Sequence, residues 1–474
     1  MNIEELTIPS IRKGLEKKDF SALELTEAFL TRIQEKEKKI HAFLNVTQDI
    51  AKEQAQYIDS LVAQKKELPL MAGVPCSVKD AIMVQGVPCT AGSKMLEKYI
   101  APYDATVIQK VKQAGVVIVG KTNMDEFGMG GSTENSAFGP TRNPHDITKV
   151  PGGSSGGAGA SVAATEAVCS LGEDTGGSIR LPASFCGTVG LKPTYGAVSR
   201  YGVISLASSL DQVGPFAKTT EDAEILFNAV KGKDPFDATS IDTPPQNTHA
   251  DFVLQNLRIG IPKEYFGEGL DSKVKEIIEK AIQKFEHAGA HVEEVQLPHT
   301  KYALSCYYVI NMSEASANLA RYDGIRYGYT TQSGNQDLFG VYVKNRGEGF
   351  GTEVKRRIML GTYALSAGYY DAYYIKAQKV RTLLKQDFDE AFKKVDVIMG
   401  PVSPFLPFSI GEKLEDPMAM YLVDIYTVPV NLVGLPALSL PIGKSGNLPV
   451  GLHVIAKLFC ENTLFNIGKA FEKL

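Results

Sequence analysis

The sequence predicts an α/β fold: a single large domain built on a twisted, mixed and largely parallel β-sheet that helices cover on both faces. Short apolar runs typical of buried strands alternate with amphipathic segments along the 474 residues. No break in composition separates two cores, and no internal repeat interrupts the pattern. Hydrophobic residues make up 44% of the chain, which supplies ample material for one large core. We therefore expect one domain over residues 1–474.

Individual elements follow from periodicity and capping signals. A helix is expected over residues 21–41, because a capping box opens at Ser21 and apolar residues then recur at a spacing of four. Other expected helices lie at 104–115 and about 272–288. Expected strands lie at 73–82, 116–120, 257–262, 290–298, 395–401, 437–443 and 450–456. The predicted parts are N-terminal helices (about 1–65), a Gly/Ser-rich core (about 66–230), a surface connection (about 231–256) and a C-terminal part (about 257–474) that completes the sheet.

Charge and cysteine content exclude several classes of protein. A net charge of −4 and a pI of about 6.1 give no overall attraction to nucleic acid or to an anionic membrane. The six cysteines are scattered without a C-x-x-C pair, which favours buried reduced thiols over a disulfide scaffold. The sequence shows no metal-ligand spacing, signal peptide or apolar run of about 18 residues, so no metal and no membrane are expected, and the expected location is the cytoplasm.

The stretch "PGGSSGGAGASVAA" at residues 151–164 is the first candidate for chemistry. It is not a P-loop, because it lacks the Gly-Lys pair. G-x-S-x-G occurs twice, centred on Ser154 and Ser155, but a nucleophile elbow needs a strand directly before it and the preceding residues hold two prolines. Taken alone, the stretch is equally compatible with a turn that caps a helix of small residues.

A second stretch, "LGEDTGGSIRLPASFCG" at 171–187, places a glycine pair directly before Ser178. Such a pair lets backbone N–H groups converge on one point, as an oxyanion hole requires. Lys79 lies in the expected strand at 73–82 and is a candidate base if burial keeps it neutral, although a solvated surface lysine is the alternative. The resulting hypothesis has Lys79 as base, Ser154 as proton relay and Ser178 as nucleophile.

These residues resemble the amidase signature family: "GGSSGG" is followed by "DTGGSIRLPA", with "VKD" upstream. The resemblance implies that Ser178 forms an acyl-enzyme, that Ser154 sits on a cis Gly153–Ser154 peptide, and that Lys79 passes protons through it. It also implies an oxyanion hole made by the backbone of Thr175, Gly176 and Gly177. Departures from the family pattern are Ala158, Gly159, Leu181 and Glu173, of which Glu173 adds a carboxylate where serine is common.

Four later segments are similar to the A subunits of bacterial glutamyl-tRNA(Gln) amidotransferases: residues 186–215, 313–328, 353–374 and 426–443. The similarity implies that the chain hydrolyses glutamine and hands ammonia to a B subunit, which amidates Glu-tRNA(Gln), and by the same route Asp-tRNA(Asn). A small C subunit would complete a heterotrimer. No cofactor is expected on this chain, since ATP and Mg²⁺ are expected on the B subunit, which would also hold most of the tRNA. A free-standing amidase acting on another small amide is the alternative.

The same resemblance implies a glutamine pocket completed by the C-terminal part of the chain. Arg357 would bind the carboxylate of glutamine, Asp424 its ammonium group, and Tyr308 would shape the slot. Sequence alone does not separate Tyr307 from Tyr308, and Arg356 and Arg357 lie together where a surface role is also reasonable.

Overall fold

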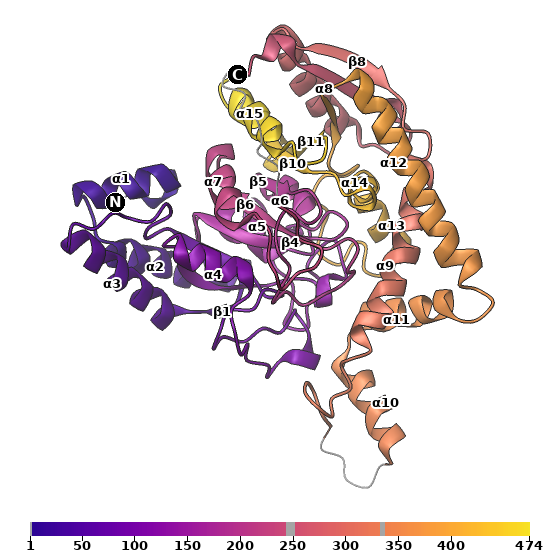
Figure 1. Ribbon diagram of the computed structural model, residues 1–474, viewed down its shortest axis with the longest axis horizontal. Helices are drawn as coiled ribbons and strands as arrows, with labels where there is room; N and C mark the ends of the chain where they lie inside the picture. The colour runs from indigo at the N-terminus through magenta and orange to yellow at the C-terminus, as the bar shows by residue number, and fades with distance from the viewer. Residues whose placement is uncertain (1, 243–251, 332–336) are drawn as a thin grey trace.

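The computed structural model describes residues 2–242, 252–331 and 337–474, and these form one mixed sheet with helices packed around it (Figure 1). The strand order is β1-β3-β2-β4-β6-β5-β10-β11-β9-β7-β8. The strands are β1 (Phe43–Val46), β2 (Pro75–Lys79), β3 (Val117–Thr122), β4 (Cys169–Asp174), β5 (Val189–Lys192), β6 (Gln212–Ala217), β7 (Arg258–Pro262), β8 (His291–Val295), β9 (Val397–Pro401), β10 (Ala437–Ser445) and β11 (Leu448–Ala456). The strands predicted from the sequence are all present.

The helices of the described residues surround this sheet. They are α1 (Ile8–Lys17), α2 (Ala22–Ile40), α3 (Gln48–Ala63), α4 (Thr106–Gln113), α5 (Gly156–Ala163), α6 (Arg180–Cys186), α7 (Thr220–Val230), α8 (Ser272–His287), α9 (Ala303–Leu319), α10 (Leu338–Gly349), α11 (Thr352–Leu365), α12 (Lys376–Lys394), α13 (Pro417–Tyr421), α14 (Val428–Val433) and α15 (Glu461–Phe471). The predicted capping box opens α2, because Ser21 and Glu24 cap each other reciprocally.

The mixed sheet was predicted correctly, but the expectation that it is largely parallel is wrong. Four of the ten strand pairings are parallel (β2 with β3 and β4, β7 with β8 and β9), and the others are antiparallel. The centre of the sheet is antiparallel for two reasons. Residues 193–211, which join β5 to β6 and are all described, contain no helix that could form a crossover, and only Gly446 and Asn447 join β10 to β11. Such a two-residue loop can form only an antiparallel hairpin.

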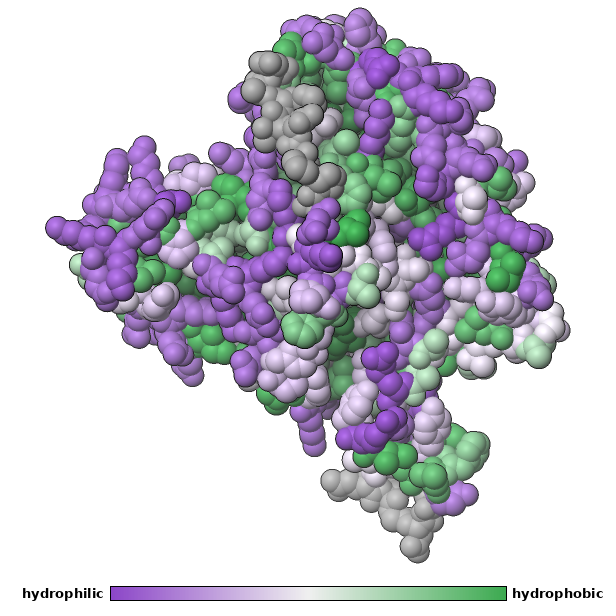
Figure 2. Space-filling view, viewed as in Figure 1, coloured by the Kyte–Doolittle hydropathy of each residue, from purple (hydrophilic) through white to green (hydrophobic). Residues whose placement is uncertain are grey.

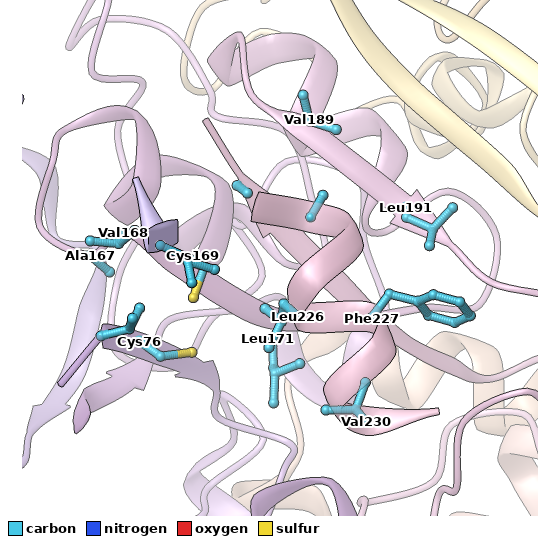
Figure 3. Close-up of a cluster of buried hydrophobic side chains, with 14 of the residues drawn as sticks. Cys76, Ala167, Val168, Cys169, Leu171, Val189, Leu191, Leu226, Phe227 and Val230 are labelled. Carbon is cyan, nitrogen blue, oxygen red and sulfur yellow. The ribbon is translucent and has the colours of Figure 1, made fainter. Parts of the chain in front are cut away.

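The core lies between the central strands and the helices that cover them. In Figure 3, Cys76 of β2 and Cys169 of β4 lie next to each other, and these residues are paired in the ladder. Leu226 and Phe227 of α7 pack into the same cluster. All six cysteines are free, and Cys460 alone is not fully buried, which agrees with the expected thiols.

Two surface features complete the fold. The predicted surface connection is mostly exposed where it is described, and residues 243–251 of it lie outside the described residues. Helix α10 projects from the body of the molecule (Figures 1 and 2). Its first residues, Leu338 and Phe339, are exposed. Within the described ranges no helix is long and apolar enough to cross a membrane, and no group of acidic, His or Cys side chains could hold a metal ion.

Helices α9 and α11 touch so closely at Gly361 that an added Cβ would lie 1.9 Å from the carbonyl oxygen of Met312. We predict that Gly361→Ala lowers the free energy of unfolding by about 1–3 kcal/mol, although alanine favours a helix. The matched control is Gly347→Ala in α10, where a Cβ meets no atom within 4 Å and stability should rise by up to about 1 kcal/mol. Urea unfolding of both variants checks this, and equal stability of the two would contradict the close packing.

Candidate active site

The glycine-serine stretch forms a tight loop that leads into α5. No strand directly precedes it, and the residues there are all described, which agrees with the rejection of a nucleophile elbow. The Gly153–Ser154 peptide is cis, as predicted. The loop rests on Asp125, whose backbone N–H donates to the Ser154 carbonyl at 3.2 Å. A Cβ at Gly153 would lie 2.2 Å from Oδ2 of Asp125, so only glycine fits this position.

Lys79, the last residue of β2, reaches the same loop. Its Nζ donates to Ser154 Oγ at 2.8 Å and to the Glu173 carbonyl oxygen at 3.2 Å. The residue is 1% exposed, which excludes the alternative of a solvated surface lysine. Burial lowers the pKa of Lys79, and the carboxylates of Glu173 and Asp125 only partly oppose that effect. A buried lysine of this kind can be neutral and can therefore act as a base.

Ser178 follows the turn between β4 and α6 and lies beside Ser155. The Ser155 N–H donates to the Ser178 carbonyl at 3.2 Å, which joins the two serine loops. The Ser178 hydroxyl makes no hydrogen bond within the described part of the chain. The structure therefore brings Lys79 and Ser154 into direct contact and leaves the Ser178 hydroxyl uncommitted beside them.

The turn that precedes Ser178 is organised by Asp174. The Asp174 carboxylate accepts from the backbone N–H of Gly177 at 2.9 Å and of Ile179 at 3.0 Å. The Gly177 N–H, one of the three predicted oxyanion donors, is thus committed to Asp174. The N–H groups of Gly176 and Ser178 have no acceptor among the described residues, so they are available to a ligand. A Cβ at Gly176 would lie 2.4 Å from Tyr307 Oη, so glycine is required there too.

Asp174 also belongs to a buried ionic network that sequence reasoning missed. Although burial opposes ionisation, the Arg180 guanidinium at 3.0 Å lowers the pKa of the Asp174 carboxylate. Arg180 donates further to His453 Nε2 at 2.9 Å, and Asn431 donates to Asp174 at 2.8 Å. The D-x-x-G spacing could have indicated the Asp174 turn. Nothing in the sequence pairs it with residues more than 250 positions away.

The predicted substrate residues gather beside this turn. The Arg357 guanidinium lies 5.2 Å from the centre of the Tyr308 ring and 5.5 Å from that of Tyr421, and these two rings stack at 4.0 Å. Glu353 accepts from Arg357 Nε and from Tyr421 Oη, both at 2.8 Å. Arg357 is 3% exposed, so it is the buried arginine of the pair and Arg356 is the outer one. Glu353, Tyr421 and Asn311, which accepts from Arg357 at 3.2 Å, were not predicted.

Asp424 ends a short 3₁₀ helix (Leu422–Asp424) on the other side of the glycine pair. Its Oδ1 would lie 3.1 Å from a Cβ at Gly177, which places its carboxylate against the turn that leads to Ser178. Burial raises the pKa of Asp424 to about 8, against the influence of Arg357. Both tyrosines that the sequence could not separate contribute, since Tyr308 packs on Arg357 and Tyr307 packs on Gly176.

A cavity of about 270 Å³ lies beside Arg357, and Arg357, Glu353 and Tyr421 form part of its lining. It is large enough for a small polar molecule. The site as a whole thus combines a serine beside unpaired backbone N–H groups, a buried lysine joined to a second serine, one arginine and one carboxylate. This arrangement suits acyl transfer from an amide that carries both a negative and a positive group.

Comparison with known proteins agrees with this chemistry. A family model described as Amidase matches residues 24–465. The A subunit of glutamyl-tRNA(Gln) amidotransferase from Koribacter versatilis is 55% identical over 475 residues, covering 100% of this chain and 99% of that protein. Its counterpart from Caldanaerobacter subterraneus subsp. tengcongensis is 54% identical over 475 residues, covering 100% and 97%. The crystal structure of the corresponding A subunit from Thermotoga maritima aligns with a TM-score of 0.83 and 41% identity, covering 100% of this chain and 95% of that one.

We predict that Asp174→Asn lowers the free energy of unfolding at pH 7 by about 3–5 kcal/mol, because the buried Arg180 charge loses its partner. The matched control is Asp396→Asn, which breaks the half-exposed pair with Arg258 and should lower it by about 1 kcal/mol or less.

The effect of Asp174→Asn also depends on pH. The folded-state pKa of Asp174 is lowered, so its stabilisation is complete above the unfolded value of about 3.9 and is lost as the pH falls below it. The difference between wild type and variant should therefore narrow below about pH 4. Denaturant unfolding across pH checks this, and a difference that stays constant with pH would contradict the ionic role.

Proposed function

The chain belongs to the amidase family, and we propose that it is the glutamine-hydrolysing subunit of a tRNA-dependent amidotransferase. The observation that carries this proposal is one positive and one acidic side chain near the turn that leads to Ser178: the Asp424 carboxylate lies against Gly177, and buried Arg357 packs on Tyr308. Free glutamine carries one carboxylate and one ammonium group, and these two side chains complement them. An amidase for a neutral amide would need neither charge, which favours glutamine over another small amide.

In the proposed reaction the chain's own residues move one proton in a cycle. Neutral Lys79 accepts the proton of Ser154 as Ser154 accepts that of Ser178, and Ser178 Oγ attacks the side-chain amide carbon of glutamine. The 2.8 Å contact between Lys79 and Ser154 serves transfer in either direction. The Ser178 hydroxyl must turn to Ser154 for this step, and such contacts often tighten only when substrate is bound.

The developing oxyanion would be held by backbone N–H groups of the turn from Thr175 to Ser178. In the described structure the N–H groups of Gly176 and Ser178 have no acceptor and could serve this role. Lys79 then returns the proton through Ser154 to the leaving nitrogen, ammonia departs, and the acyl-enzyme on Ser178 is hydrolysed by water. A positioned base contributes about 10²–10⁴ in rate, and an oxyanion donor about 10²–10³.

The names of the relatives, each a subunit of an amidotransferase, and the charge of the chain support the partners proposed here. We assign ATP, Mg²⁺ and most tRNA contacts to a B subunit, which would use the ammonia to convert Glu-tRNA(Gln) or Asp-tRNA(Asn), with a small C subunit completing a heterotrimer. The net charge of −4 supports tRNA binding elsewhere than on this chain. Translation, as the process served, supports a cytoplasmic location, and no cofactor is needed for the chemistry assigned here.

We predict that Asp424→Asn lowers kcat/KM for glutamine by about 10- to 100-fold, because the bound ammonium group favours the ionised form of Asp424 and would lose that carboxylate as a hydrogen-bond partner. Hydrolysis of a small neutral amide, tested with the same enzyme, should be unchanged, whereas the inactive control Ser178→Ala should lose both activities. Glutamate and ammonia release from the chain with its partner subunits checks this. An equal loss for both amides, or no loss for glutamine, would point to the free-standing amidase.

A further inference from the structure

Among the described residues, the buried carboxylate of Glu173 forms the ion-pair contact with Lys79, and the proposed reaction does not use it. It lies in the same strand, β4, as Asp174, and its Oε2 lies 3.8 Å from Lys79 Nζ. The residue is 2% exposed, and its Oε1 has no hydrogen-bond partner in the described structure. A buried carboxylate oxygen without a hydrogen-bond partner costs folding free energy, so its presence calls for an explanation.

Glu173 also lines a second cavity, of about 270 Å³, whose lining shares no residue with that of the cavity beside Arg357. Its lining includes Arg200, Ser205, Ser208, Asp211 and Phe236. The rim reaches the surface, because Ser208 is exposed and Phe236 is 70% exposed. Glu173 therefore lies between the buried lysine and this second cavity, whose lining contains none of the proposed substrate residues.

The other charged groups that face Glu173 are already engaged. Asp211 accepts from the Thr175 hydroxyl at 2.8 Å and from the backbone N–H of Leu206 at 2.9 Å. Asp174 is held by Arg180, and Arg200 donates to Thr239 Oγ1 at 2.7 Å. Of these three carboxylates, Glu173 alone keeps an oxygen free for a proton in the described structure. Burial and the nearby Asp211 raise the pKa of Glu173 to about 8, in the range where a group both takes up and releases protons at neutral pH.

The proposed function creates a proton that must leave. Hydrolysis of the amide to a carboxylate and neutral ammonia, RCONH₂ + H₂O → RCOO⁻ + NH₃ + H⁺, releases one proton in each turnover. A partner that uses ammonia as a nucleophile needs it neutral, so ammonia cannot carry that proton away. The newly formed carboxylic acid transfers its proton through the Ser154 hydroxyl to neutral Lys79. The surplus proton is then on the lysine.

We infer that Glu173 is the proton exit of this amidase centre, a group that takes the surplus proton from Lys79 and releases it into the second cavity. In this step an N–H bond of the Lys79 ammonium breaks and an O–H bond forms on Glu173. The proton then passes to water or to a buffer base in the cavity, and Lys79 is neutral again for the next turnover. The inference rests on the proposed function, since it assumes that ammonia leaves uncharged.

The test is chemical rescue of glutamine hydrolysis by the chain with its partner subunits. Glu173→Ala removes the proton carrier and enlarges the cavity, and Glu173→Gln removes it without changing size. In weak buffer at pH 7 we expect kcat of both variants to fall about tenfold or more, and formate added to Glu173→Ala to restore it in proportion to its concentration. The matched control is Glu166→Gln, since Glu166 is also fully buried with unpartnered oxygens among the described residues but has no contact with Lys79.

Labelling of Ser178 by a generic serine-acylating reagent verifies that each variant is folded. If Glu173→Ala does not fold, the test uses Glu173→Gln alone. Wild-type kcat in either folded variant without buffer would overturn the inference, as would a loss that formate does not restore in Glu173→Ala. If Glu173→Gln is the only folded variant, a loss that does not change with pH would overturn it. Failure of the wild type itself to release glutamate would overturn the proposed function instead, so the two outcomes are distinct.

Discussion

The buried ion pair between Asp174 and Arg180 is the interaction on which the rest of the site depends. Asp174 fixes the turn that carries Gly177 and Ser178, and Arg180 extends from the same carboxylate into the C-terminal half of the chain. There Arg180 donates to the Thr427 carbonyl, and the Thr427 hydroxyl donates back to the Gly176 carbonyl at 2.6 Å. The nucleophile turn and the segment that carries Asp424 are thus held as one unit. A charged pair this deep is tolerable because its remaining hydrogen-bonding positions are filled by neutral partners such as Asn431 and His453.

The second constraint is the burial of a lysine at the end of β2. In water a lysine amine is protonated at neutral pH and cannot accept a proton. Here desolvation lowers its pKa, and the nearby carboxylates of Glu173, Asp125 and Asp211 partly oppose that effect. These carboxylates therefore influence whether Lys79 can act as a base.

The sequence was informative where signals are local and silent where they depend on the fold. Turns and caps require particular residues at fixed spacing, so the sequence indicated the capping box at Ser21 and the two Gly/Ser stretches. It also indicated the strand that contains Lys79. The parallel character of the sheet was overestimated because the Gly446–Asn447 hairpin signal was overlooked. The Arg180 network, the Glu353 support of Arg357 and the second cavity at Glu173 depend on contacts between distant residues. No periodicity or spacing reports such contacts.

The central claim is that Ser178 is a nucleophile facing a pocket built for glutamine. The measurement that tests it most directly is mass spectrometric mapping after the chain, with its partner subunits, reacts with a diazoketone analogue of glutamine. We expect a single adduct on Ser178 that free glutamine suppresses. An adduct on another residue would contradict it. So would a Ser178 that reacts with a generic acylating reagent but never with the glutamine analogue.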